Sequence, residues 1–385
     1  MSWKKCEIMD ERIKFVSRLL NGEGMSELCR EFNISRKTGY KFYNRYKQEG
    51  LEGFYDKSRR PFNSANRIAK QIEQFILDIK EEHSSWGARK IRERLRRNHS
   101  NIKLPALSTV HAVLDRNDLV KARKKRYKAQ GTNLSIAKEP NDLWCADFKG
   151  QFKLKNGKYC YPLTITDNAC RFILACESLE SNAEETAFPV FERSFKEYGL
   201  PNAIRTDNGV PFANPNALFQ LSKLAVWWMR LGIRIERIEP GHPEQNGRHE
   251  RMHRTLKEET TKPVSSNLLQ QQEKFDLFLQ QFNFERPHEA LNMKFPSEIY
   301  INSKKIYADL DDLDYPQHDL TLRVSPCGSI RFNKMRIYIS TALSFQNLGV
   351  TEIDDQLWNV SFMNFNLGYF DEDTCKLQLS NNPFL

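Results

Sequence analysis

Residues 143–154 read LWCADFKGQFKL, and the runs KYCYPLTITD (158–167) and RFILACESL (171–179) follow. These apolar stretches come at hairpin-like intervals, which predicts three sequential strands. A helix is predicted over 184–198, and the short strand AIRTD then ends at Asp207. The βββαβ order indicates a mixed α/β domain. The next predicted elements are an apolar helix (218–231), a strand (234–238), an irregular segment (239–247) and a helix (248–259).

Basic charge is concentrated in the front part of the chain. Residues 1–138 hold 32 Lys and Arg against 16 Asp and Glu, whereas residues 139–385 hold 27 against 33. The net charge of +10 therefore comes from one end. Neutralising phosphates releases their counterions, so this asymmetry favours a front half that binds nucleic acid. A solvated basic surface is the alternative that charge alone leaves open.

Length and composition exclude several classes of protein. The chain has 385 residues, of which 39% are hydrophobic and 28% are charged, enough for two or three domains with their own cores. A run of about 18 apolar residues would be needed to span a membrane; the sequence has none, so we expect no membrane contact. The N-terminus lacks a secretory signal pattern, and the eight cysteines include no C-x-x-C pair. We expect a cytoplasmic protein whose cysteines are thiols.

A helix-turn-helix pattern occupies residues 1–60. Apolar residues recur at helical spacing from Glu11 to Leu20, and Asn21-Gly22 supplies a stop. Ser26 is predicted to cap a second helix and Ser35 to cap a third. This arrangement is typical of a DNA-binding domain, in which the last helix reads the major groove.

The third helix is the predicted reading element. Helical spacing is expected to place its tyrosines on one side: Tyr40, Tyr43 and Tyr46. The residues predicted to contact DNA lie on the other side or flank it: Lys37, Lys41, Asn44, Arg36 and Arg45. A plain three-helix bundle with a solvated basic face is the alternative.

A second helix-turn-helix unit is predicted over residues 61–120. Its first helix carries Ile72, Phe75, Ile76 and Ile79 in register, its second covers Ala88–Arg97, and Ser108 is predicted to cap its third. Basic residues before and after this unit are predicted to contact the DNA backbone: Arg59 and Arg60 in the preceding linker, and Lys124, Lys125 and Arg126 in the basic linker 121–138.

Three segments resemble the DDE transposase and retroviral-integrase superfamily. They are Trp144-Cys-Ala-Asp147, Arg205-Thr-Asp207-Asn-Gly209 and Pro243-Glu-Gln-Asn-Gly247-Arg-His-Glu250. Downstream, FNFERPHEAL (282–291) and PSEIY (296–300) look like tail motifs of bacterial insertion-sequence transposases. The resemblance implies a ribonuclease H-like catalytic core over 139–302, with a mixed five-stranded sheet and helices. It also implies a bacterial protein that associates with the nucleoid when bound to DNA.

The resemblance assigns catalysis to Asp147, Asp207 and Glu250, which are separated by 59 and 42 residues. The second gap is longer than the family's commonest spacing, which implies a small insertion before Glu250. The three carboxylates are implied to hold two Mg²⁺ ions, with Mn²⁺ able to substitute; Asp147 would bridge both ions. Hard cations prefer oxygen ligands, and two metals can stabilise the attacking and leaving oxygens of phosphoryl transfer.

The implied activity is cleavage and strand transfer of double-stranded DNA. The substrates would be the terminal repeats of a mobile element and a target DNA, and the protein would act as a homo-oligomer on DNA. A catalytically silent DNA-binding regulator derived from a transposase is the second hypothesis. The intact carboxylate triad favours the enzyme.

The helix that carries Glu250 contains two further patterns. Arg254 and Lys257 follow at i+4 and i+7 and are predicted to hold the DNA end, with a Glu250–Arg254 pair as the alternative. His249-Glu-Arg-Met-His253 also matches H-E-x-x-H, the pattern of zinc peptidases. Zinc peptidases carry this pattern on a buried helix, whereas this helix is charged on nearly every side, so we do not expect a buried helix here. Glu250 is preferred to Glu244, which lies in an irregular loop.

Short alternating runs beyond Asp319 predict a small antiparallel β domain over 318–385. It is similar to the SH3-like C-terminal domains of this superfamily. Glu352–Asp355 is expected to be an acidic loop. A protein contact within a transposition complex fits this domain as well as a DNA contact does.

Overall fold

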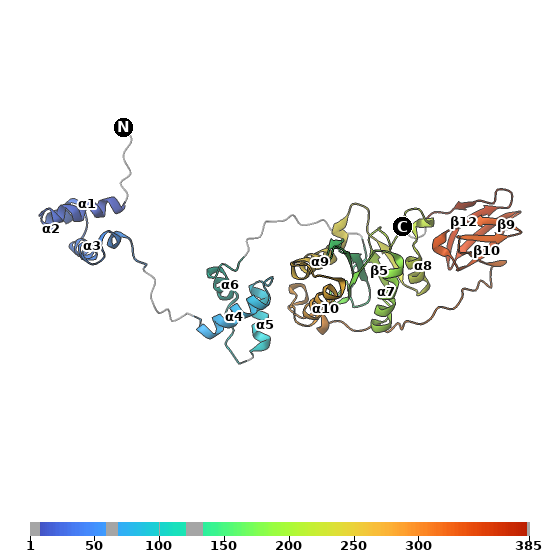
Figure 1. The fold of residues 1–385 in the computed structure, drawn as a ribbon, viewed down its shortest axis with the longest axis horizontal. Helices are drawn as coiled ribbons and strands as arrows, with labels where there is room; N and C mark the ends of the chain where they lie inside the picture. Colours follow the sequence, from blue (N-terminus) through green and yellow to red (C-terminus); the bar gives the residue numbers. More distant parts are fainter. Residues whose placement is uncertain (1–7, 59–67, 100, 121–133, 383–385) are drawn as a thin grey trace, which may run out of the picture. The chain divides into compact units, whose positions relative to one another are not determined.

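The computed structural model describes residues 8–58, 68–99, 101–120 and 134–382 (Figure 1). The chain divides into two compact units, Met1–Ile68 and Ala69–Leu385. Within the described residues, no helix combines the length and the apolar character needed to cross a membrane. The predicted DNA contacts Arg59, Arg60, Lys124, Lys125 and Arg126 lie outside the described residues.

The first unit is a three-helix arrangement closed by a 3-10 turn. Its elements are α1 (Ile8–Leu20), α2 (Met25–Glu31), α3 (Arg36–Glu49) and η1 (Gly50–Phe54). The predicted cap of α3 is confirmed, because the Ser35 hydroxyl accepts a hydrogen bond from the Thr38 amide at 3.2 Å. The cap predicted at Ser26 is wrong: α2 begins at Met25 after Gly24, so Ser26 lies inside the helix. Gly39 brings α3 close to α2, since a Cβ there would lie 2.8 Å from Cys29 Sγ.

The second unit begins with three more helices, α4 (Lys70–Glu82), α5 (Ala88–Asn98) and α6 (Leu107–Arg116). They confirm the three predicted helices and enclose a small core that includes Ile76, Ile91 and Val110. The cap predicted at Ser108 is wrong. The helix starts at Leu107 after Ala106, so the serine lies in the first turn and no side chain caps this end.

A mixed sheet forms the centre of the second unit. Its strands are β1 (Trp144–Phe148), β2 (Phe152–Lys153), β3 (Tyr159–Asp167), β4 (Ile173–Leu179), β5 (Ala203–Thr206) and β6 (Arg234–Arg237). The order is β2-β3-β1-β5-β6, and β4 pairs with β3. β3 is antiparallel to β1 and to β4, whereas β5 is parallel to β1 and to β6. The predicted mixed sheet is therefore confirmed, with β2 as a two-residue addition at an edge.

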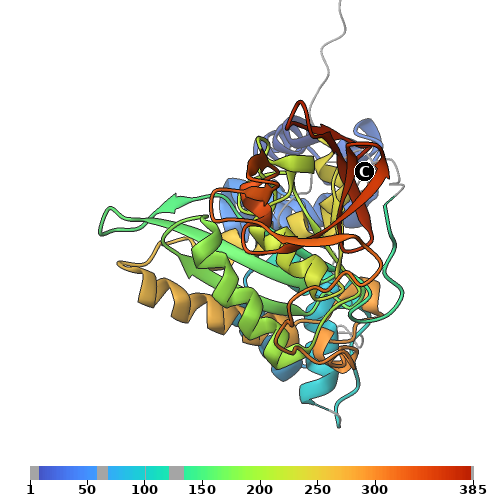
Figure 2. The same cartoon turned by 90° about the vertical axis from the view of Figure 1, so that its right-hand side faces the viewer.

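Helices cover both faces of this sheet (Figure 2). On one face, α7 (Glu184–Tyr198) and α8 (Lys223–Arg230) pack through Phe191, Phe195 and Trp228. On the other face, α9 (Gly247–Thr260) and α10 (Leu268–Phe284) pack through Leu256 and Phe275. α10 was not predicted. The helix predicted over 218–231 is interrupted, because η2 (Leu218–Gln220) ends before Ser222 caps α8. Three further 3-10 turns are η3 (Pro243–Asn246), η4 (Glu289–Leu291) and η5 (Pro296–Glu298).

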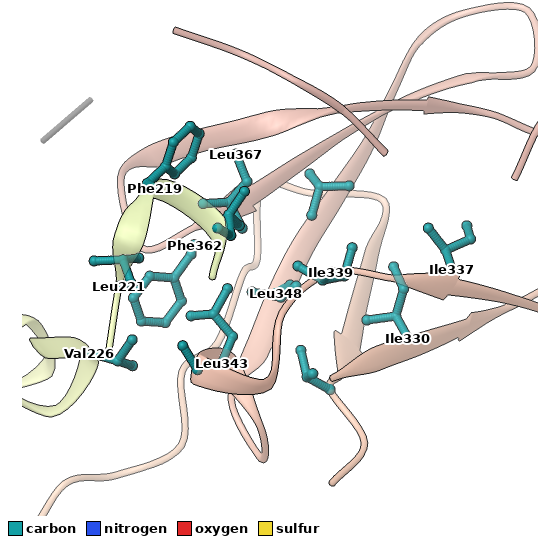
Figure 3. Packing of buried hydrophobic residues seen from close by; sticks show 14 of the residues in the cluster. Phe219, Leu221, Val226, Ile330, Ile337, Ile339, Leu343, Leu348, Phe362 and Leu367 are labelled. Atoms are coloured by element: carbon teal, nitrogen blue, oxygen red, sulfur yellow. The ribbon is translucent and has the colours of Figure 1, made fainter. Parts of the chain in front are cut away.

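The C-terminal strands form a small antiparallel arrangement, as predicted. They are β7 (Leu320–Arg323), β8 (Ser329–Phe332), β9 (Met335–Tyr338), β10 (Asn347–Asp354), β11 (Leu357–Phe362), β12 (Phe365–Asp371) and β13 (Leu377–Leu379). β13, β12, β11, β10 and β7 form one sheet, and β8 pairs with β9. The expected acidic loop Glu352–Asp355 is wrong for most of its length, since residues 352–354 lie within β10 and only Asp355 lies in the following turn. Leu343, Leu348 and Phe362 share a hydrophobic cluster with Leu221 and Val226 from the region around the mixed sheet (Figure 3).

Candidate active site

Two of the predicted catalytic carboxylates lie where the carboxyl ends of two neighbouring strands meet. Asp147 lies on β1, and Asp207 directly follows β5, the parallel neighbour of β1. The pKa of Asp147 is raised to about 7, chiefly by burial and next by the charge of Asp207; Glu250 adds a smaller contribution. Burial also raises the pKa of Asp207, although the Gly209 amide donates to its carboxylate at 3.1 Å. A cation between such carboxylates would relieve both the repulsion and the burial of charge.

Glu250 approaches these strand ends from the first turn of α9, where its side chain is exposed. Arg205, from the segment RTDNG, holds the start of that helix in place. Its buried guanidinium pairs with Glu236 on β6 at 2.5 Å and donates to the Gln245 carbonyl at 3.2 Å and the Ser135 carbonyl at 2.6 Å. Arg205 therefore joins β5, β6 and the turn before α9. In the sequence, Arg205 was noted only as the first residue of the RTDNG segment, and no structural role was predicted for it.

Arg254 and Lys257 are exposed on the same side of α9 as Glu250. The alternative Glu250–Arg254 pair is not formed, and neither cation makes an ion pair within the described part of the chain. Their charges are therefore available to an external anion.

Glu244 differs from Glu250 in its surroundings. It lies in η3, and its carboxylate is 2.8 Å from His242 Nδ1. This contact lowers the pKa of Glu244 and raises that of His242. A cavity of about 260 Å³ beside them is lined by residues 207–209 and 238–242, which include Asp207 but neither Glu244 nor Glu250. The choice of Glu250 over Glu244 stays a prediction.

α9 is not buried as a whole, but one of its faces is. His249, Met252, His253 and Leu256 are all buried, because β3 supplies hydroxyl partners for the imidazoles and α10 supplies apolar ones for the rest. Burial lowers the pKa of His249 to about 3, and it lowers the pKa of His253 well below its usual value. The i, i+3, i+4, i+7 spacing of these residues was a signal for a buried face, which the surrounding charges obscured.

These histidines lie beside Asp147. Thr164 Oγ1 on β3 is 2.7 Å from His249 Nε2 and 2.6 Å from His253 Nε2. His253 Nδ1 is 3.5 Å from Asp147 Oδ2. Asp147, His249 and His253 each offer an atom capable of binding a metal, and these atoms lie within 4.8 Å of one another. Sequence reasoning did not include either histidine among the site residues.

The predicted reading helix α3 presents a polar face. Arg36, Lys37, Lys41 and Asn44 are exposed, whereas Arg45 is half-buried with its guanidinium 5.8 Å from the Phe42 ring. The prediction that Tyr40 lies on the side opposite the DNA-contacting residues is wrong. It is 52% exposed and lies on the polar face, three residues after Lys37 and four before Asn44, while Phe42 takes the central core position.

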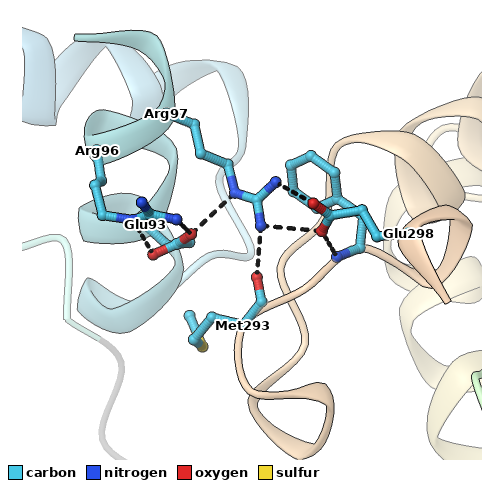
Figure 4. Close-up of polar contacts among 6 residues, drawn as sticks. Glu93, Arg96, Arg97, Met293 and Glu298 are labelled. Carbon is cyan, nitrogen blue, oxygen red and sulfur yellow. Dashed lines mark hydrogen bonds and ion pairs between the residues drawn. The ribbon is translucent and has the colours of Figure 1, made fainter. Parts of the chain in front are cut away.

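The strongly basic helix α5 directs three arginines at carboxylates of the segment 285–298, which follows α10. Arg89 pairs with Glu289 at 2.9 Å and Arg94 with Glu285 at 3.0 Å. Arg97 forms two parallel hydrogen bonds to Glu298, at 2.9 and 3.0 Å (Figure 4). These cations therefore contribute to an internal interface of the second unit.

Comparison with known proteins agrees with this architecture. The family "Integrase core domain" matches residues 137–243 and 231–296. The families "Helix-turn-helix domain" and "Homeodomain-like domain" match residues 11–62 and 38–114. The sheet, with carboxylates at the ends of β1 and β5, and these matches define a protein with an integrase core behind DNA-binding helix-turn-helix elements. The chain is a member of the DDE transposase and integrase superfamily.

Similar proteins include the "Insertion element IS407 uncharacterized 31.7 kDa protein" of Burkholderia multivorans, 27% identical over 184 residues. The "Insertion element IS476 uncharacterized 39.2 kDa protein" of Xanthomonas euvesicatoria is 22% identical over 228 residues. These alignments cover 46% and 59% of this chain and 64% of each relative, so the chain spans less than two thirds of their length. Among solved structures, the HTLV-2 integrase catalytic core domain in complex with magnesium is 18% identical, with a TM-score of 0.34, over 42% of this chain and 98% of that one.

Proposed function

We propose that the protein is a transposase that cuts and joins DNA at the ends of a mobile element. Asp147, Asp207 and Glu250 would form its catalytic carboxylate site, and the helical front half would bind the element's terminal repeats. The domain boundaries inferred from the sequence fit this division of labour. Target DNA would meet the carboxylate edge of the sheet within a homo-oligomer.

One observation carries this proposal: Asp147 and Asp207 lie at neighbouring ends of the parallel strands β1 and β5, and burial raises the pKa of both. Asp207 and Glu250 both raise the pKa of Asp147, although 59 and 102 residues separate them from it in the sequence. A folded protein gains nothing in stability by gathering like charges at a half-buried edge. Perturbed carboxylates of this kind are instead typical of sites that bind a cation or perform catalysis.

The donor set fits magnesium, because carboxylate oxygens are the ligands that hard divalent cations prefer. Asp147, Asp207 and Glu250 would hold two such ions, which would stabilise the charge that develops on the attacking and leaving oxygens. Arg254 and Lys257, exposed beside Glu250, would bind the phosphates of the DNA end. In the first step, a water oxygen bonds to phosphorus and the bond to the 3′ oxygen breaks. The oxygen of the released 3′-OH then bonds to a phosphorus of the target, and the bond from that phosphorus to the target's own 3′ oxygen breaks, which leaves a 3′-OH on the target strand.

The test is incubation of the purified full-length protein with its flanking DNA ends and Mg²⁺. We expect strand nicking by the wild type and its reduction by about 100- to 1000-fold in Asp207→Asn and Glu250→Gln, since removing one preorganised group that stabilises transition-state charge costs about 10²–10³ in rate. Glu244→Gln is the matched control, because it removes an acid six residues from Glu250 that pairs with His242. All variants should retain DNA binding.

Two results would contradict the proposal. Nicking by Asp207→Asn at the wild-type rate would remove this carboxylate from the site. Binding of the element ends without nicking by the wild type would favour the catalytically silent regulator.

A further inference from the structure

The Thr164 hydroxyl determines which ring nitrogens of two buried histidines carry hydrogen. Its single hydrogen points to the Asp147 carbonyl oxygen, 3.1 Å away, which can only accept. With its hydrogen placed on that carbonyl oxygen, Thr164 Oγ1 accepts from His249 Nε2 at 2.7 Å and from His253 Nε2 at 2.6 Å, and the tautomer of each ring follows from this assignment. In both neutral imidazoles, Nδ1 is consequently the nitrogen without hydrogen.

With this assignment, neither ring nitrogen of His249 is free to bind a metal ion. Its Nδ1 lies 2.8 Å from Thr166 Oγ1, from which it accepts a hydrogen bond. Both ring nitrogens of this residue are thus occupied by threonines of β3. A zinc site of the H-E-x-x-H kind needs both imidazoles as ligands, and this arrangement leaves only one.

His253 differs, because its Nδ1 faces a carboxylate. The distance from this nitrogen to Asp147 Oδ2 is 3.5 Å. An ionised Asp147 carboxylate and an Nδ1 without hydrogen are both acceptors, so one metal ion placed between them would bind both. Ligand atoms about 2.1 Å from a common ion lie about 3.0 Å apart in octahedral geometry and about 3.4 Å apart in tetrahedral geometry. The observed separation is close to this range.

We propose that His253 Nδ1 and the Asp147 carboxylate are ligands of the same divalent ion, which makes one metal position at this site a mixed nitrogen and oxygen position. The inference rests on the proposed function, because it uses the same Asp147. Imidazole nitrogen binds transition-metal ions better than it binds Mg²⁺. The position therefore suits ions from Mn²⁺ to Zn²⁺, and His253 gives the site its preference for them over Mg²⁺.

The test measures Co²⁺ and Mg²⁺ affinity of the full-length protein by calorimetry, with visible absorption reporting the Co²⁺ ligands, in the absence of DNA. We expect His253→Leu to weaken Co²⁺ binding at least about tenfold, as loss of a group that supports a metal site does. Mg²⁺ binding should change much less. His111→Leu is the control, because this histidine is exposed on α6.

A measurement on the wild type keeps the test decisive, because His253 is only 4% exposed and its replacement could disturb folding. In protein labelled with ¹⁵N at histidine, addition of Zn²⁺ should shift one Nδ1 resonance that has the Nε2–H tautomer. The same resonance should be missing from His253→Leu. No shift of any such histidine resonance on Zn²⁺ binding would overturn the proposal.

Asp147→Asn separates the two hypotheses. Loss of Co²⁺ binding in Asp147→Asn and its weakening in His253→Leu would support both. Loss in Asp147→Asn with wild-type affinity and absorption in His253→Leu would overturn the role of His253 alone. Unchanged Co²⁺ binding in Asp147→Asn would overturn the carboxylate site itself, and this inference with it.

Discussion

Arg97 offers a quantitative test of the contacts between α5 and the segment that follows α10 (Figure 4). Its guanidinium forms two hydrogen bonds to Glu298, a further one to the Met293 carbonyl at 3.3 Å, and a contact with Glu93 at 2.9 Å. It also lies 3.9 Å from the centre of the Phe295 ring. Loss of this side chain should therefore weaken the interface more than loss of its main partner.

The magnitudes follow from geometry and exposure. The side chains of Arg97 and Glu298 are 22% and 38% exposed, so we assign the pair about 1 kcal/mol, between an exposed ion pair and a buried charged hydrogen bond. The Phe295 ring and the remaining bonds add about 1 kcal/mol to the effect of Arg97→Ala. Glu298 also accepts from the Phe295 amide at 2.6 Å, which adds about 0.5 kcal/mol to the effect of Glu298→Ala.

The assay is amide hydrogen exchange of α4–α6 in the full-length protein, since the contacts with Glu298 exist only while these helices are folded. Effects of about 2 and 1.5 kcal/mol correspond to exchange about 30-fold faster in Arg97→Ala and about 13-fold faster in Glu298→Ala. The double variant should exchange about 70-fold faster, because the shared 1 kcal/mol is lost only once. Arg96→Ala is the control, because Arg96 is 54% exposed and pairs only with Glu93 among the described residues. Exchange about 400-fold faster in the double variant would mean additive effects and would refute the direct pairing.

Three further outcomes are expected. Since the pKa of Asp147 is raised to about 7, the metal-free folded protein binds a proton that the unfolded chain has lost between about pH 4 and 7, so its stability should fall as pH rises through that window. A metal ion binds the ionised carboxylate of Asp147, so metal affinity should rise by up to about tenfold per pH unit until pH 7. The released proton can be measured by calorimetry in two buffers, and a metal affinity independent of pH would contradict the raised pKa of Asp147. Gly368→Ala should lower the free energy of urea-induced unfolding by about 2 kcal/mol or more, since its Cβ would lie 2.1 Å from the Gln378 carbonyl oxygen at a φ of +144°; wild-type stability would rule out that close approach. Lys41→Ala should change the base preference of DNA binding in a selection from random sequences, whereas Lys47→Ala, in the last turn of α3, should weaken binding to all sequences alike; the reverse pattern would show that another face of α3 reads the bases.

Local sequence patterns predicted most helices and strands, because helical and strand periodicity is written in neighbouring residues. The wrong predictions of helix caps at Ser26 and Ser108 show a limit of such local patterns. A serine near a helix start caps it only if the first turn begins directly after it, and in α2 and α6 the first turn begins earlier. Tyr40 was misplaced because three tyrosines at equal spacing suggested one apolar side, whereas Phe42 and Gly39 form the centre of the buried side.

By itself, the sequence determined the order of most elements, the concentration of basic charge in the front half, and the three segments that contain Asp147, Asp207 and Glu250. Only the tertiary structure decided that β1 and β5 are neighbours, that Arg205 anchors the start of α9, and that His253 turns inward to Thr164 and Asp147. The physical reason is separation along the chain. Thr164 and His253 are 89 residues apart, and Arg97 and Glu298 are 201 apart, so local periodicity carries no information about either contact. A charged helix such as α9 acquires a buried face only when β3 brings hydroxyl groups to satisfy its imidazoles, and that pairing depends on the assembled sheet.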